Sequence, residues 1–358
     1  MKRLAQLVLI IVVTGLLSWW AFRDAKWDEQ WQSLREANYL WLIPYLGLLG
    51  VIHLCRTLRW GYLLSGLERV RFKKLNEASA IGFMMLLVLP FRLGEFARPY
   101  LIAQRSRIRK SAAMTSVVLE RIVDGLLVAT LLRVLLFFVP GDSDDIRYVK
   151  WGSTVMFAVF GGGLAFLLFA LWQQKLAVSL VRRTIGRFVP KLADKAAEIV
   201  DAFVGAMRQL PDAKNLIGFF VATFVYWGVN GAGMAMVARA FDLHLTLFQG
   251  YVVMCVLVAG LMVPSAPGMI GAFQAATKVG LALFLPPALV SASGLAYANV
   301  VWFTQTAQQI LTGLVFMSAT HMSFRDVTRN MGDRPELPSE GASSEPAQAS
   351  AVGLPPAV

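Results

Sequence analysis

Residues that build metal and redox sites are scarce in this sequence. It contains two cysteines and three histidines among 358 residues. Cys55 and Cys255 each lie inside an apolar run without CxxC spacing, which is typical of small buried residues rather than of a disulfide framework. The histidines are far apart in the sequence, and none belongs to a pattern such as HExxH. We therefore expect no metal site and no cofactor.

Charged residues are also scarce. Asp, Glu, Lys and Arg make up 16% of the chain, whereas soluble domains have about 25%. Hydrophobic residues make up 57%, and the mean hydropathy is +0.59. This composition predicts an all-α polytopic membrane protein. The net charge of +12 fits the excess of Lys and Arg in cytoplasmic loops and their attraction to anionic lipid headgroups, so we expect no nucleic-acid partner.

Apolar runs and their charged flanks predict about six full crossings, at residues 4–22, 39–65, 111–139, 150–172, 215–241 and 288–319. Lys2 and Arg3 predict a cytoplasmic N-terminus, and Arg325 and Arg329 predict a cytoplasmic C-terminus. The first run lacks the small-x-small pattern of a signal-peptide cleavage site, so we expect it to be retained.

Two further segments, at about residues 75–104 and 246–285, predict re-entrant helical hairpins. The stretch VLPFRLGEFARPYLI, residues 88–102, interrupts apolar sequence with two prolines and a glycine. Basic segments flank residues 75–104 on both sides, so the chain must enter the membrane and return. Pro90-x-x-x-Gly94 in the first segment matches Pro267-x-x-x-Gly271 in the second. Broken helices at corresponding positions in two halves predict an inverted repeat.

The other segments predict surface and disordered regions. Trp27 and Trp31 lie at helical spacing in a charged segment, which predicts a short amphipathic helix in the outer interface. Residues 173–214 combine many basic residues with an apolar stripe, which predicts a cytoplasmic surface helix. Residues 329–358 are rich in Pro, Ser, Ala and Gly and are expected to form a disordered cytoplasmic tail, so the transmembrane domain covers residues 1–328.

Polar residues within the apolar segments are the candidate binding residues, because a charge in the hydrocarbon is costly and is functional by default. Glu120 and Asp124 share one helical face, and Arg121 is spaced to reach Asp124. Arginine forks suit phosphate groups. The alternatives are a structural ion network, interhelical hydrogen bonds and arginines that reach toward the interface. The candidate residues are Arg56, Arg59, Arg92, Glu95, Arg98, Glu120, Arg121, Asp124, Gln274 and Gln305.

Four motifs together resemble one family: RTLRW at residues 56–60, PFRLGEFARPYL at 90–101, LERIVDG at 119–125 and PSAPGMIGAFQ at 264–274. The chain resembles the flippase-like membrane domain of lysylphosphatidylglycerol synthases, which also occurs as a stand-alone protein. The resemblance implies a protein of the bacterial inner membrane that moves or binds lipid-linked substrates. Two departures from the family are expected to matter. Only a short tail follows the last helix, without an aminoacyl-transferase domain, and Gln274 replaces a usual glutamate.

We therefore expect a lipid transporter of the flippase type rather than an enzyme. Its partners would be membrane lipids with a phospholipid, aminoacyl-lipid or polyprenyl-phosphate headgroup, either anionic or zwitterionic. The sequence contains no nucleotide-binding motif, so movement would depend on a gradient or be passive. One alternative is a non-transporting membrane partner of a separately encoded envelope-lipid enzyme. A lipid-modifying enzyme embedded in the membrane is the other, with Glu120 and Asp124 as an acid–base pair.

Overall fold

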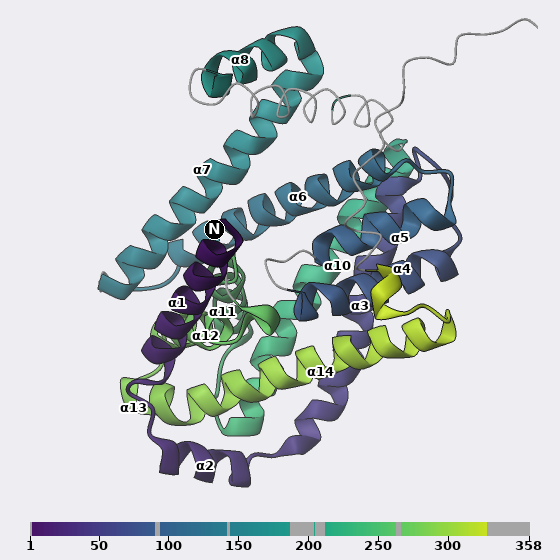
Figure 1. The fold of residues 1–358 in the computed structure, drawn as a ribbon. Coiled ribbons are helices and arrows are strands. Elements are labelled where there is room, and N and C mark those ends of the chain that lie inside the picture. Colours follow the sequence, from purple (N-terminus) through teal and green to yellow (C-terminus); the bar gives the residue numbers. More distant parts are fainter. Residues whose placement is uncertain are drawn as a thin grey trace, which may run out of the picture.

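The computed structural model describes residues 2–89, 94–141, 144–186, 204, 212–262 and 266–327. These residues are helical or form turns, and no strand occurs among them, which confirms the all-α fold class. Figure 1 shows long helices packed around two shorter helix pairs. Three expected features lie partly or wholly outside the described residues: Arg92, residues 187–203 and 205–211 of the expected cytoplasmic surface helix at 173–214, and the expected tail at 329–358.

Each expected crossing coincides with a long helix. These helices are α1 (Lys2–Phe22), α3 (Leu42–Leu64), α6 (Lys110–Phe137), α7 (Asp144–Trp172), α10 (Ala213–Ala238) and α14 (Leu295–Ala319). In the described chain, three stretches are long and apolar enough to cross a membrane: Tyr39–Leu64, Ile146–Trp172 and Ala213–Phe241. The total of six crossings stays a prediction, since helices such as α6 contain several charged residues within their apolar sequence.

The first predicted hairpin segment folds back on itself. Helix α4 (Phe72–Val88) packs against α5 (Ala97–Arg105). A Cβ atom on Gly94 would lie 2.0 Å from the backbone nitrogen of Leu86, and one on Gly82 would lie 2.2 Å from Cγ of Arg98. The chain therefore reverses direction after α4, and glycine is needed where the two backbones meet.

The second predicted hairpin segment has the same shape. It consists of α11 (Leu247–Gly260), the short 3₁₀ turn η4 (Pro267–Met269) and α12 (Ala272–Ala282). A Cβ atom on Gly280 would lie 3.0 Å from Cα of Val253, and one on Gly260 would lie 2.4 Å from Cβ of Ala276. The order of these contacts is reversed along the two helices, so α11 and α12 run antiparallel in close contact. Helix α4 packs against η4, which joins the two pairs. Re-entry into the membrane and the inverted repeat stay predictions.

The remaining helices pack on these pairs or on one another. Helix α3 packs along α10, and α14 packs along α4 (Figure 1). Helix α1 lies beside α12, and α7 packs on α6 and leads into α8 (Gln174–Gly186). The predicted amphipathic helix is α2 (Trp27–Glu36), and its Trp27 and Trp31 side chains are exposed. The helices α3, α5, α6 and α10 converge on one buried polar cluster.

Candidate functional site

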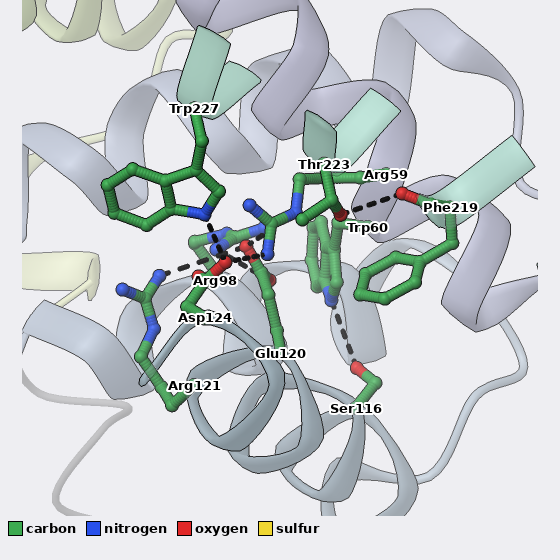
Figure 2. Close-up of polar contacts among 10 residues, drawn as sticks. All are labelled: Arg59, Trp60, Arg98, Ser116, Glu120, Arg121, Asp124, Phe219, Thr223 and Trp227. Atoms are coloured by element: carbon green, nitrogen blue, oxygen red, sulfur yellow. Dashed lines mark hydrogen bonds and ion pairs between the residues drawn. The ribbon is translucent and has the colours of Figure 1, made fainter. Parts of the chain in front are cut away.

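Helix α6 supplies the acidic side of a buried ion cluster (Figure 2). Glu120 and Asp124 lie one turn apart on the same face of α6, and both are buried. Arg59 reaches them from α3, where it is 0% exposed. The sequence predicts this shared face from the four-residue spacing.

Glu120 is surrounded by three arginines. Its Oε2 lies 3.3 Å from Nη1 of Arg98, and its Oε1 lies 3.7 Å from Nε of Arg59. Nη2 of Arg121 is 3.8 Å from the same Oε1, so Arg121 pairs with its neighbour, whereas the spacing argument pairs it with Asp124. A carboxylate buried in apolar surroundings is stable only when it is paired in this way.

Asp124 accepts hydrogen bonds from two other helices. Nη2 of Arg59 lies 2.5 Å from its Oδ1, and the indole Nε1 of Trp227, on α10, donates to the same oxygen at 3.1 Å. Arg59 therefore bridges both carboxylates of α6. This bridge connects α3, α6 and α10 within the cluster.

Arg98 has one more nitrogen without a described hydrogen-bond partner than Arg59. Arg59 also lies over aromatic rings, those of Phe219 and Tyr226, and its Nε alone has no hydrogen-bond partner among the described residues. The guanidinium of Arg98 lies over the rings of Trp60 and Phe83, at 4.5 Å and 4.6 Å from their centroids. Trp60 is itself held by Ser116, whose Oγ accepts a hydrogen bond from the indole Nε1 at 3.0 Å. Arg98 is 2% exposed, yet its Nε and Nη2 have no hydrogen-bond partner in the described part of the chain. A buried donor without a partner costs about 1–3 kcal/mol.

A polar cavity of about 90 Å³ lies next to this cluster. Its lining includes Arg56 from α3 and Tyr226 and Asn230 from α10, together with glutamines of α14. The Arg56 guanidinium lies over the ring of Phe83, the same ring that Arg98 contacts. The cavity and the cluster are therefore separated by little more than one aromatic ring.

The cationic groups outnumber the acidic ones in this region. Arg56, Arg59, Arg98 and Arg121 are all buried or half-buried. They face Glu120 and Asp124, and Glu95 also interacts electrostatically with Arg121. Counting Glu95, four arginines stand against three carboxylates. The described part of the site thus has an excess of positive charge and favours an anion.

The structure places the two glutamines of the prediction differently. Gln305 lines the polar cavity and donates to the hydroxyl of Tyr45 at 2.6 Å. Gln274 lies buried at the start of α12, where its Oε1 accepts from the backbone N–H of Gly271 at 2.9 Å. Its Nε2 lies 3.2 Å from Oδ1 of Asn299 on α14. The bonds of Gln274 therefore cap a helix and tie it to α14.

Sequence reasoning missed several residues of the site. Trp227, Tyr226 and Asn230 belong to the apolar run FVYWGVNG of α10. Phe83 belongs to α4 and contacts two arginines. For the residues of α10 the sequence did contain a signal, since Tyr226 and Asn230 lie one helical turn apart in an apolar run. A helix that faces only lipid rarely contains asparagine close to tyrosine and tryptophan.

The family described as lysylphosphatidylglycerol synthase TM region matches residues 5–307. The chain belongs to this family. The match includes every candidate residue and confirms the resemblance predicted from the four motifs. The protein is therefore a membrane protein with helices able to span a bilayer.

Glycosyltransferase AglD from Haloferax volcanii is similar to this chain. It is 25% identical to this chain over 262 residues. The match covers 66% of this chain and 42% of the relative, so the chain matches less than half of the relative's length. No solved structure matches the chain.

Proposed function

We propose that the protein binds the anionic headgroup of a membrane lipid at the arginine cluster and moves the lipid across the bilayer. The observation that carries this proposal is the environment of Arg98. Its guanidinium is buried against two aromatic rings, and its Nε and Nη2 have no hydrogen-bond partner among the described residues. These two nitrogens form one edge of the guanidinium fork, the edge that binds two oxygens of a phosphate or carboxylate.

The charges of the cluster favour an anion over a cation. Glu120 and Asp124 are already paired with arginines and the indole of Trp227, so they are poorly placed to take an amine. The Nε and Nη2 edge of Arg98, in contrast, has donors that no described residue of the chain accepts. We therefore expect phosphate-bearing headgroups, such as those of phospholipids or polyprenyl-phosphates, to bind more tightly than headgroups without net negative charge.

The size of the polar cavity bears on the mechanism. A water molecule requires about 10–15 Å³ of such space, so a cavity of about 90 Å³ holds a few waters or a phosphate-sized group. A complete phospholipid headgroup requires the surrounding helices to separate. The two helix pairs, α4 with α5 and α11 with α12, are the elements that we expect to move. In this proposal they are re-entrant hairpins of an inverted repeat in the bacterial inner membrane, with both termini cytoplasmic.

Transport assays in reconstituted vesicles test this proposal. We expect the protein to accelerate transbilayer movement of fluorescent phosphatidylglycerol more than that of phosphatidylcholine. Arg98→Gln should slow this movement at least about tenfold, because a hydrogen bond to a charged group contributes about 1.5–3 kcal/mol. Arg133→Gln is the matched control, since Arg133 is exposed and donates to Thr154 outside the cluster. Equal rates for Arg98→Gln and the wild type would contradict the proposal.

A second candidate function follows from the names of the family and of the similar protein. One is the transmembrane region of a synthase and the other is a glycosyltransferase, and both names denote enzymes. The chain would then be a membrane partner of a lipid-processing enzyme, or would act on lipid itself. Bound lipid without transbilayer movement would favour the partner function. A change in lipid mass after incubation with the purified protein would favour the enzyme.

A further inference from the structure

A long apolar groove of about 560 Å³ lies between α3 and α14. On α3 its lining includes Leu42 and Leu46, and on α14 it includes Phe303, Ala307 and Leu311. Within each helix these residues are spaced by four, so they form one continuous face. Leu46, Phe303 and Leu311 are largely exposed, so the groove is open along one side.

The groove and the polar cavity meet at Gln308. This residue lines both spaces, and its Nε2 bonds Oγ1 of Thr312 at 3.1 Å within the groove. On α3 the lining residues also change from apolar to polar along the helix. Leu42 and Leu46 line the groove, and His53 and Arg56 line the cavity farther along the same helix. The apolar groove therefore continues into the polar cavity that Arg56 lines.

We propose that this groove binds one hydrocarbon chain of the lipid whose phosphate-bearing headgroup enters the polar cavity beside the arginine cluster. The inference rests on the proposed function and adds to it the binding site of the lipid tail. The lining of α14 runs from Val300 to Thr312, which corresponds to about 18 Å at 1.5 Å per residue. One leaflet of the hydrocarbon core is about 15 Å thick, so the groove has the length of one acyl chain.

A second apolar groove provides a comparison. It has a volume of about 360 Å³ and is lined by residues of α6, α7, α11 and α12, among them Leu132, Val159 and Ala259. In the described part of the chain it shares no lining residue with the polar cavity. Continuity with the arginine-containing cavity therefore distinguishes the α3–α14 groove from an ordinary lipid-facing surface.

Photocrosslinking tests the inference. The probe is phosphatidylglycerol with a diazirine in one acyl chain, incorporated with the protein into lipid nanodiscs, and labelled peptides are identified by mass spectrometry. We expect the α14 peptide around Ala307 to be labelled above the peptides of the second groove. Ala307→Phe places a ring in the groove and should reduce this labelling to the level of the second groove. Ala319→Phe is the matched control on the same helix, because Ala319 is exposed outside the groove.

The outcomes separate this inference from the proposed function. Labelling around residue 307 that is unchanged in Ala307→Phe, or that is equal in both grooves, would overturn the tail site. Labelling that falls in Ala307→Phe and also in Arg98→Gln supports tail and headgroup together. Labelling that falls in Ala307→Phe but is the same in Arg98→Gln and with a phosphatidylcholine probe keeps the tail site and refutes the headgroup assignment.

Discussion

Replacing Arg98 with methionine is expected to remove anion binding while leaving the stability of the fold nearly unchanged. Methionine retains an unbranched apolar side chain against the rings of Trp60 and Phe83. It removes one ion pair, from Nη1 to Glu120 at 3.3 Å. It also removes two buried nitrogens that have no hydrogen-bond partner in the described chain.

The energy lost with the ion pair and the energy gained by removing the buried, unpaired nitrogens nearly cancel. A unit-charge pair at this distance contributes about 5 kcal/mol at an effective dielectric constant of about 20. Burying the guanidinium costs several kcal/mol, and each unpaired donor adds about 1–3 kcal/mol. Glu120 keeps Arg59 and Arg121 as partners, so no carboxylate is left unpaired. We expect the free energy of unfolding to change by about 1–2 kcal/mol at most.

Glu120→Gln, in contrast, should strongly lower the stability of the fold. This change removes the carboxylate that faces Arg59, Arg98 and Arg121, and it leaves their charges to repel one another. Leaving a buried charge without its partner costs about 3–5 kcal/mol. Stability should therefore depend on Glu120 far more than on Arg98, although the two residues form one ion pair.

Unfolding in detergent, followed by tryptophan fluorescence, measures the stability of both variants. Titration with dihexanoyl phosphatidylglycerol measures binding. Losing two charge-assisted hydrogen bonds should weaken binding by Arg98→Met at least about 100-fold. Glu29→Gln is the control, since the Lys26–Glu29 pair is exposed and should contribute about 0–1 kcal/mol. The reasoning is refuted if Arg98→Met is as unstable as Glu120→Gln, or if it binds the lipid like the wild type.

Gly94→Ala and Gln274→Met test the two helix pairs, and Gly47→Ala in α3 is a comparison for the first. Gly94→Ala should lower the free energy of unfolding by at least about 1–3 kcal/mol, because its Cβ would meet the backbone of Leu86. Gly47→Ala, a helical glycine with no atom within 4 Å of its Cβ position, should instead raise it by about 0.5–1 kcal/mol. Gln274→Met should cost about 1 kcal/mol through loss of the bond to Gly271, with unchanged anion binding, and reduced binding would show that Gln274 has a role in the headgroup site.

Helix positions were predictable because hydrophobic periodicity is local. The expected crossings at 111–139 and 215–241 correspond closely to α6 and α10. The expected crossing at 288–319 is less regular, because the five residues Val290–Gly294 form a π-turn before α14 begins. A π-turn adds a residue to one turn of the helix, and no simple pattern of apolar residues indicates it.

The binding residues were only partly predictable. Glu120 and Asp124 were paired correctly on one face, since four-residue spacing on a helix implies it. Their principal partner, Arg59, lies more than 60 residues earlier on another helix, and Trp227 lies about 100 residues later. Spacing along the chain carries no information about contacts at such separations.

The sequence by itself determined the membrane class, the helices, the family and the set of charged residues that require partners. These depend on composition and on contacts within a few residues. How the charges are shared depends on the tertiary structure: Arg59 is paired with two carboxylates, and Arg98 has two nitrogens without a hydrogen-bond partner in the part of the chain that the structure describes. The tertiary structure also placed Gln274 in a helix cap rather than in the cluster. The physical reason is that the pairing of a buried charge depends on which helices pack together, and that packing is a sum over contacts between distant parts of the chain.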